Sequence, residues 1–267
     1  MSEDLQVIDV TTESTQVLSL LTKAELDIQI TTAKAFPRKI SNCLKEAVDM
    51  AVMSKEISES CIYSLPQKDS SGKDSYIVGP SVRLAEIAAN CWGNLHSGAR
   101  IVQNDGKTIT GEAIAWDLEK NNKVTIQSSK SIVGKRGVYP VHMQNTTGKA
   151  AASIAYRNAI FKIIPKSIID TIFKEAKKVA TGSDKPIAQR INEAIIYFTK
   201  LGISETRLLE LLNKESRELI DDEDLLMLLG IKNAVVDGAI TIDSILKTNQ
   251  GDSNSKAKAL YERLKGE

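Results

Sequence analysis

The residues of this chain that are most able to do chemistry are the lysines and arginines of its middle part. Residues 123–178 contain eleven basic side chains and two acidic ones, although the whole chain of 267 residues carries 35 basic and 34 acidic side chains. The compensating acid follows, because residues 184–243 contain twelve acidic and seven basic side chains. A basic segment beside an acidic one favours a surface that binds polyanions. A basic helix face that is merely solvated is the alternative that charge alone leaves open.

Several of these cations are spaced so that a nucleic acid could use them together. On a helical projection, Lys149, Ser153, Tyr156 and Arg157 fall within an arc of about 100°. Cations beside a hydroxyl and an aromatic ring are typical of single-strand sites, where charge follows the backbone and the ring stacks on a base. The candidate DNA-binding residues are Arg83, Lys123, Lys130, Lys135, Arg136, Tyr139, Lys149, Tyr156, Arg157 and Lys162.

Three of these candidates also have a structural interpretation. Tyr156 and Tyr139 could each be a packed side chain instead of a ring that stacks on a base. Arg83 could face DNA or could pair with Glu86, because residues three apart are neighbours on a helix surface. The sequence leaves these alternatives open.

No set of side chains predicts an enzyme. The stretch Thr147-Gly148-Lys149-Ala150 lacks the first glycine and the final hydroxyl of a phosphate-binding loop. Asp117 and Glu119 are interpreted as solvated polarity beside a hairpin turn, since no third carboxylate supports a two-metal site. The two histidines and three cysteines lack the spacing of a zinc site. We therefore expect no catalysis, metal or cofactor, and we expect the cysteines to be buried thiols.

The elements that would position these residues alternate between helical and extended patterns. A helical pattern begins near residue 22, is interrupted by Pro37 and resumes from about 40 to 55, with apolar residues at four-residue spacing. Alternating residues over 95–133, with the turn sequence Asn104-Asp105-Gly106, predict a three-stranded antiparallel meander. Helices are expected at 148–164 and, after the interruption at Pro165, at 166–180. The predicted fold class is α+β, with the meander packed against helices.

Composition divides the chain into four segments. Residues 1–22 are expected to be a mobile N-terminal segment, and residues 23–180 a DNA-binding α+β core. A linker rich in Gly, Ser, Asp and Pro leads to a small all-helical C-terminal module at 187–247. Its helices are expected at 187–201, 205–212 and 222–236, and residues 248–267 are expected to be a polar tail.

Several segments resemble one known family. They are residues 24–38, which end in Phe36-Pro37-Arg38; the run 77–86, with Gly79-Pro80-Ser81-Val82-Arg83; Trp92-Gly93-Asn94; and Arg157-Asn158 before Ile164-Pro165. Together they resemble the single-strand annealing recombination proteins of bacteriophages and prophages, of the RecT and Erf kind. The resemblance covers about residues 24–180, and residues 229–238 are similar to a small helical tail module found on several such proteins.

The resemblance implies a core of three strands and a helix, assembly into rings or filaments, and no hydrolysis of nucleotides. It implies ATP-independent binding of single-stranded DNA and annealing of complementary strands in phage recombination or replication. The C-terminal module would then be a contact for an exonuclease or a single-strand-binding protein. The rival hypothesis is a structural or adaptor protein whose basic face binds an acidic protein partner.

The sequence also bears on location. No apolar run approaches the roughly 18 to 20 residues of a membrane span. The acidic, polar N-terminus lacks the pattern of a signal peptide. We therefore expect a cytoplasmic protein, in a bacterial host cell if the resemblance holds, with no membrane partner.

Overall fold

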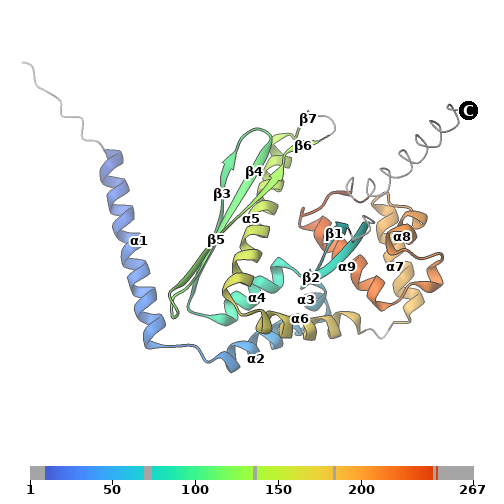
Figure 1. The fold of residues 1–267 in the computed structure, drawn as a ribbon, viewed down its shortest axis with the longest axis horizontal. Helices are drawn as coiled ribbons and strands as arrows, with labels where there is room; N and C mark the ends of the chain where they lie inside the picture. Colours follow the sequence, from blue (N-terminus) through green and yellow to red (C-terminus); the bar gives the residue numbers. More distant parts are fainter. Residues whose placement is uncertain (1–9, 69–73, 135–136, 183–184, 243–244, 246–267) are drawn as a thin grey trace, which may run out of the picture.

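The computed structural model describes residues 10–68, 74–134, 137–182, 185–242 and 245, and Figure 1 shows their arrangement. The fold is α+β, which confirms the predicted class. The first elements are α1 (Val10–Ala35), α2 (Ile40–Ala51), α3 (Lys55–Ser60), β1 (Ile62–Lys68), β2 (Asp74–Pro80), α4 (Val82–Trp92), β3 (Leu95–Asn104), β4 (Thr108–Asp117) and β5 (Asn122–Ser131). They are followed by β6 (Val133–Gly134), β7 (Gly137–Val138), α5 (Val141–Ile163), α6 (Lys166–Thr181), α7 (Ile187–Lys200), α8 (Glu205–Leu212), the 3-10 turn η1 (Arg217–Leu219) and α9 (Asp222–Val236).

The predicted meander is present as an antiparallel sheet with the strand order β3-β4-β5. Its first turn is stabilised by Asp105, whose carboxylate accepts hydrogen bonds from the backbone N–H of Lys107 at 2.8 Å and of Thr108 at 2.6 Å. Gly106 in this turn has a φ of 80°, which glycine adopts at little cost. The local sequence therefore determines the register of the first hairpin.

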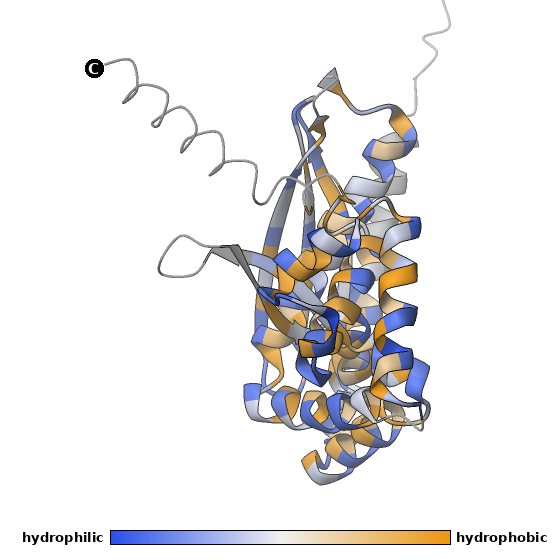
Figure 2. Cartoon of the chain, turned by 90° about the vertical axis from the view of Figure 1, so that its right-hand side faces the viewer, coloured by the Kyte–Doolittle hydropathy of each residue, from blue (hydrophilic) through white to orange (hydrophobic). Residues whose placement is uncertain are grey.

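Helix α5 covers one face of this sheet, and small residues allow it to lie close (Figure 1). An ideal Cβ built on Gly111 in β4 would lie 2.3 Å from the backbone nitrogen of Ala152. Ala151, Ala155 and Ala159 of α5 are fully buried. The opposite face, called here the outer face, carries side chains such as Arg100, which is 72% exposed. Figure 2 shows the same elements from the side, coloured by the hydropathy of each residue.

Helices α2, α4 and α6 complete the main hydrophobic core with α5 and the sheet. Helix α4 begins after an N-cap at Ser81, whose hydroxyl accepts hydrogen bonds from the N–H groups of Arg83 and Leu84. The three cysteines are buried free thiols, as expected. Burial raises the pKa of Cys61 to about 11. None of the helices that the structure describes is long and apolar enough to span a membrane.

Some predicted boundaries are wrong. Helix α5 starts at Val141, two turns before the expected Gly148, because the Pro140 carbonyl accepts the first helical N–H bonds. Gly148 lies inside the helix, where the side chains of Ile101 and Ile109 would meet a Cβ. Helix α1 begins at Val10 instead of residue 22. The short β6–β7 hairpin and helix α3 have no counterpart in the prediction.

The C-terminal helices form a second hydrophobic core together with the β1–β2 hairpin. Tyr63 and Tyr76 of the hairpin belong to this core. Helix α9 lies directly on β1, since a Cβ on Gly230 would lie 2.7 Å from the backbone nitrogen of Ser64. Asn233 donates hydrogen bonds to the carbonyls of Glu59 and Ile62, each at 2.8 Å. The segment 187–247 thus shares a hydrophobic core with part of the segment 23–180.

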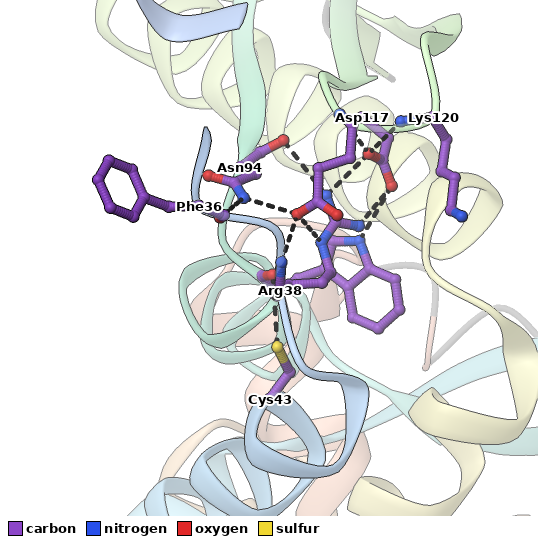
Figure 3. A network of polar contacts seen from close by, with 8 residues as sticks. Phe36, Arg38, Cys43, Asn94, Asp117 and Lys120 are labelled. Atoms are coloured by element: carbon purple, nitrogen blue, oxygen red, sulfur yellow. Dashed lines mark hydrogen bonds and ion pairs between the residues drawn. The ribbon is translucent and has the colours of Figure 1, made fainter. Parts of the chain in front are cut away.

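A buried ion-pair network joins the start of α2 to the end of the sheet (Figure 3). The Arg38 guanidinium donates to Asp117 and Glu119, and it lies 4.7 Å from the ring centre of Trp92. Asn94 donates to Glu119 at 2.6 Å. The side chains of Arg38 and Asp117 are each only 6% exposed. The interpretation of Asp117 and Glu119 as solvated polarity is therefore wrong, because a cation distant in sequence meets them.

Candidate nucleic-acid interface

Three of the predicted DNA-binding cations come together in the structure. Arg83 lies on α4, Lys130 on β5 and Arg157 on α5. All three lie close to residues 237–239, the segment that follows α9 and that we call the strap. Tertiary packing thus gathers side chains from three elements that are well separated along the chain.

Lys130 is the most enclosed of the three cations. It is half-buried, and its Nζ donates a hydrogen bond to the Ala239 carbonyl at 2.5 Å. Burial lowers the pKa of Lys130, because removal of water disfavours the charged amine. The side chain points to the α5 side of the sheet, since Lys130 pairs with the buried Ile109 of β4.

Arg83 pairs with Glu86, which is one of the two alternatives that the sequence left open. Its guanidinium is 3.0 Å from the Glu86 carboxylate, and it also lies 3.9 Å from the carboxylate of Asp237 in the strap. The side chain is 52% exposed, so a solvated anion could approach it. The pKa of Asp237 is raised, because burial outweighs the attraction of Arg83.

Arg157 is held between an aromatic ring and an amide. Its guanidinium carbon lies 4.9 Å from the ring centre of Tyr63, and Nε and Nη2 donate to the Asn158 side-chain oxygen at 3.3 and 3.1 Å. The ion pairs found between described residues do not include Arg157. A half-buried guanidinium that is oriented but not neutralised is suited to bind an anion.

A cleft of about 510 Å³ opens beside Arg157, between the β1–β2 hairpin and α5. Apolar side chains form most of its wall, with Arg157, Asn158 and Tyr63 as the polar-tipped members; the apolar residues are Leu65, Pro66, Ile77, Pro80 and Phe161. Its volume lies in the range of small-molecule sites, which are mostly apolar with a few polar groups that orient the ligand. Burial raises the pKa of Tyr63, although Arg157 opposes this shift. The Tyr63 ring therefore stays a neutral support for the guanidinium.

The remaining candidates are distributed over other surfaces. Lys149 and Lys162 are exposed on α5. Lys123 is exposed on the outer face, where its Nζ lies 5.5 Å from the ring centre of Trp116. Lys135 and Arg136 lie outside the described residues.

The two tyrosines predicted as stacking candidates are both in packed positions. The Tyr156 hydroxyl lies 3.3 Å from the Ser97 hydroxyl in β3, and its half-buried ring packs against the main core. The Tyr139 ring lies against Gly134, where a Cβ would come within 2.6 Å of the ring. The Tyr156 ring is thus placed as the structural interpretation describes, whereas Tyr139 is half-buried beside the β6–β7 hairpin, and stacking on a base stays a prediction for both.

The sequence reasoning missed two aromatic residues. Tyr63 supports Arg157, but it lies in a short strand with no local signal that connects it to α5. Trp116 could have been found, because alternation along β4 places it on the same face as Glu112 and Ile114, away from the Gly111 side that α5 covers. Together with Lys123 it forms an exposed pair of cation and aromatic ring.

The part of the chain that the structure describes holds no cluster of three His, Cys, Asp or Glu side chains that could bind a metal. The site instead offers cations, an oriented guanidinium and an open apolar cleft, which is chemistry for binding. Comparison with models of protein families, with curated proteins and with solved structures finds no match to this chain.

Proposed function

We propose that this protein binds single-stranded DNA and anneals complementary strands without ATP, in phage recombination or replication. The placement of Arg83, Lys130 and Arg157 around one strap, with Arg157 also lining the apolar cleft, is the observation that supports this proposal most. The resemblance to the RecT and Erf kind of annealing protein supports it independently. We propose no catalytic step, because pairing of strands needs none.

The arrangement suits a flexible, charged strand. Phosphates would contact Lys130, Arg83 and Arg157, and the exposed Lys149 and Lys162 on α5 would extend the path. A guanidinium plane can stack on a base while its edge donates hydrogen bonds, so Arg157 could contact a base at the mouth of the cleft. Neutralised phosphates lower the repulsion between two strands and let them approach.

Strand pairing tests the proposal. Two labelled complementary oligonucleotides, each precoated with protein, are mixed without any nucleotide, and duplex formation is followed by energy transfer. We expect faster pairing than without protein, and none for strands that are not complementary. Arg157→Gln should slow pairing, whereas Lys200→Gln, which removes an equal charge from the exposed end of α7, should not.

Two outcomes would contradict the proposal at different levels. Tight binding without faster pairing would leave a passive single-strand binder. No binding at all would overturn the proposal and favour the adaptor hypothesis, in which the same cations meet an acidic protein partner.

A further inference from the structure

The strap lies beside the three cations that the proposed function uses, which are Arg83, Lys130 and Arg157. The Lys130 ammonium donates its hydrogen bond to the Ala239 carbonyl, and the Arg83 guanidinium faces the Asp237 carboxylate. Arg157, Asp237 and Ala239 line the same small cavity of about 20 Å³. One short segment of the C-terminal module therefore lies against all three converging cations.

The strap is short and is held at both ends. Helix α9 before it is fixed to β1 by Asn233 and by the close approach of Gly230. Ile240 after it is buried in the second core. Gly238 in its middle has a φ of 68°, a conformation that other residues rarely adopt. The N–H groups of Asp237, Gly238 and Ala239 donate to the last carbonyls of α9, so displacement of the strap would break these end bonds, while Asn233 and Gly230 would still hold the body of α9 on β1.

The contacts of the strap are poorly balanced in charge. The Lys130 ammonium meets a neutral carbonyl, and the nearest cation to Asp237 is the Arg83 guanidinium at 3.9 Å. Burial lowers the pKa of Lys130 and raises that of Asp237, so each charged form is disfavoured where it lies. A phosphate would be a stronger partner for Lys130 than a carbonyl, because it adds the attraction of a full opposite charge in a half-buried place.

We infer that the strap is an autoinhibitory contact: while it is closed, it withholds Lys130 from DNA phosphates and holds the Asp237 carboxylate beside Arg83, and a bound strand displaces it. This inference rests on the proposed binding of single-stranded DNA. It assigns a regulatory role to residues 237–239, at the boundary between the C-terminal module and the sheet.

A disulfide can lock the strap and test this. A Cβ on Gly238 would lie 3.7 Å from the Cβ of Ala150 in α5, within the usual disulfide range of about 3.5–4.5 Å. Gly238→Cys with Ala150→Cys in the full chain can be compared in its oxidised and reduced forms. Wild type under the same oxidant is the control, since its three cysteines are buried.

We expect the oxidised form to bind a labelled oligo-dT several-fold more weakly than the reduced form. Its log–log salt slope should be smaller by about 0.7, the value for the one phosphate contact that Lys130 would make. Equal affinity in both forms would overturn the inference but leave the proposed function intact. Absence of binding in wild type and in both forms would overturn the proposed function itself.

A second variant covers the case in which the double cysteine protein fails to fold. Asp237→Asn keeps the shape of the strap but removes its attraction for Arg83, so affinity should rise. Glu223→Gln removes the same charge from the exposed start of α9 and is the matched control. An equal gain in both variants would mean that net charge alone acts, and it would contradict the role of the strap.

Discussion

At the residue scale, Arg157 shows how recognition and packing can share one side chain. The Tyr63 ring supports the guanidinium plane, and Asn158 takes two of its N–H donors. An arginine carries five such donors, so an anion can still be bound. Its basic character could be predicted from the sequence, but Tyr63 could not, because their contact depends on how the β1–β2 hairpin meets α5.

The Arg38–Asp117 pair should be a main source of stability. Loss of one partner of a buried ion pair costs about 3–5 kcal/mol, and the lower end applies to Asp117 because Glu119 still faces Arg38. We expect Asp117→Ala to lower the free energy of unfolding by that order in urea titrations. Glu86→Ala, which breaks the exposed pair with Arg83, should cost at most about 1 kcal/mol. Similar losses for both variants would contradict the account of this network.

The same pair predicts a dependence of stability on pH. Burial raises the pKa of Asp117, but hydrogen bonds from Arg38 and the attraction of its charge outweigh this and hold the pKa below its usual value. The folded state therefore binds this proton less tightly than the unfolded state. Its contribution is present above the ordinary carboxyl pKa of about 3.9 and is lost as pH falls through the lower folded value.

This dependence is measured by urea titrations of wild type and Asp117→Asn at a series of acidic pH values. We expect the difference in unfolding free energy between the two proteins to shrink as pH falls through this window. A difference that stays constant with pH would contradict the depressed pKa.

At the element scale, the packing of α5 on the sheet depends on one glycine. A Cβ at Gly111 would overlap the backbone of Ala152, whereas a Cβ at Gly98 on the outer face meets nothing within 4 Å. We expect Gly111→Ala to reduce stability by at least about 1–3 kcal/mol, the usual cost of overpacking. Gly98→Ala should be nearly neutral, and thermal unfolding of the two variants compares them. Equal melting temperatures would mean that α5 does not lie on the sheet as described.

The elements that local sequence signals define could be predicted, and those that depend on distant contacts could not. The meander follows from alternation and from the turn at Asp105, and α8 and α9 have the predicted bounds. The start of α5 could not be predicted, because a glycine such as Gly148 usually marks the end of a helix. Here Gly148 lies inside α5 and lets the helix pack closely on Ile101 and Ile109. Gly238 marks the end of α9 in the sequence, but the contact of the strap with Lys130 on β5 could not be predicted, because it depends on tertiary packing.

At the scale of the whole molecule, α1 extends away from the other elements at one end (Figure 1). Leu20 and Ile28 on this helix are each 67% exposed. The resemblance to annealing proteins implies assembly into rings or filaments, and we propose that α1 bridges copies of the chain. We expect Leu20→Lys with Ile28→Lys to reduce the assembly mass in light scattering while circular dichroism is unchanged. Lys23→Glu with Thr31→Lys, at exposed positions of the same helix, is the control. An unchanged mass for the apolar pair would remove α1 from the assembly.

The central claim is that the cations gathered beside the strap contact the DNA backbone. The most direct measurement is the affinity for an unstructured oligonucleotide as salt is raised, for a variant with Arg83→Gln, Lys130→Gln and Arg157→Gln. Lys39→Gln, Lys45→Gln and Lys200→Gln remove three exposed charges elsewhere and form the control. We expect the site variant to lose about 2 from the log–log slope, at roughly 0.7 for each phosphate contact. The control should keep the wild-type slope. A site variant with the wild-type slope, or a control with an equal loss, would contradict the claim.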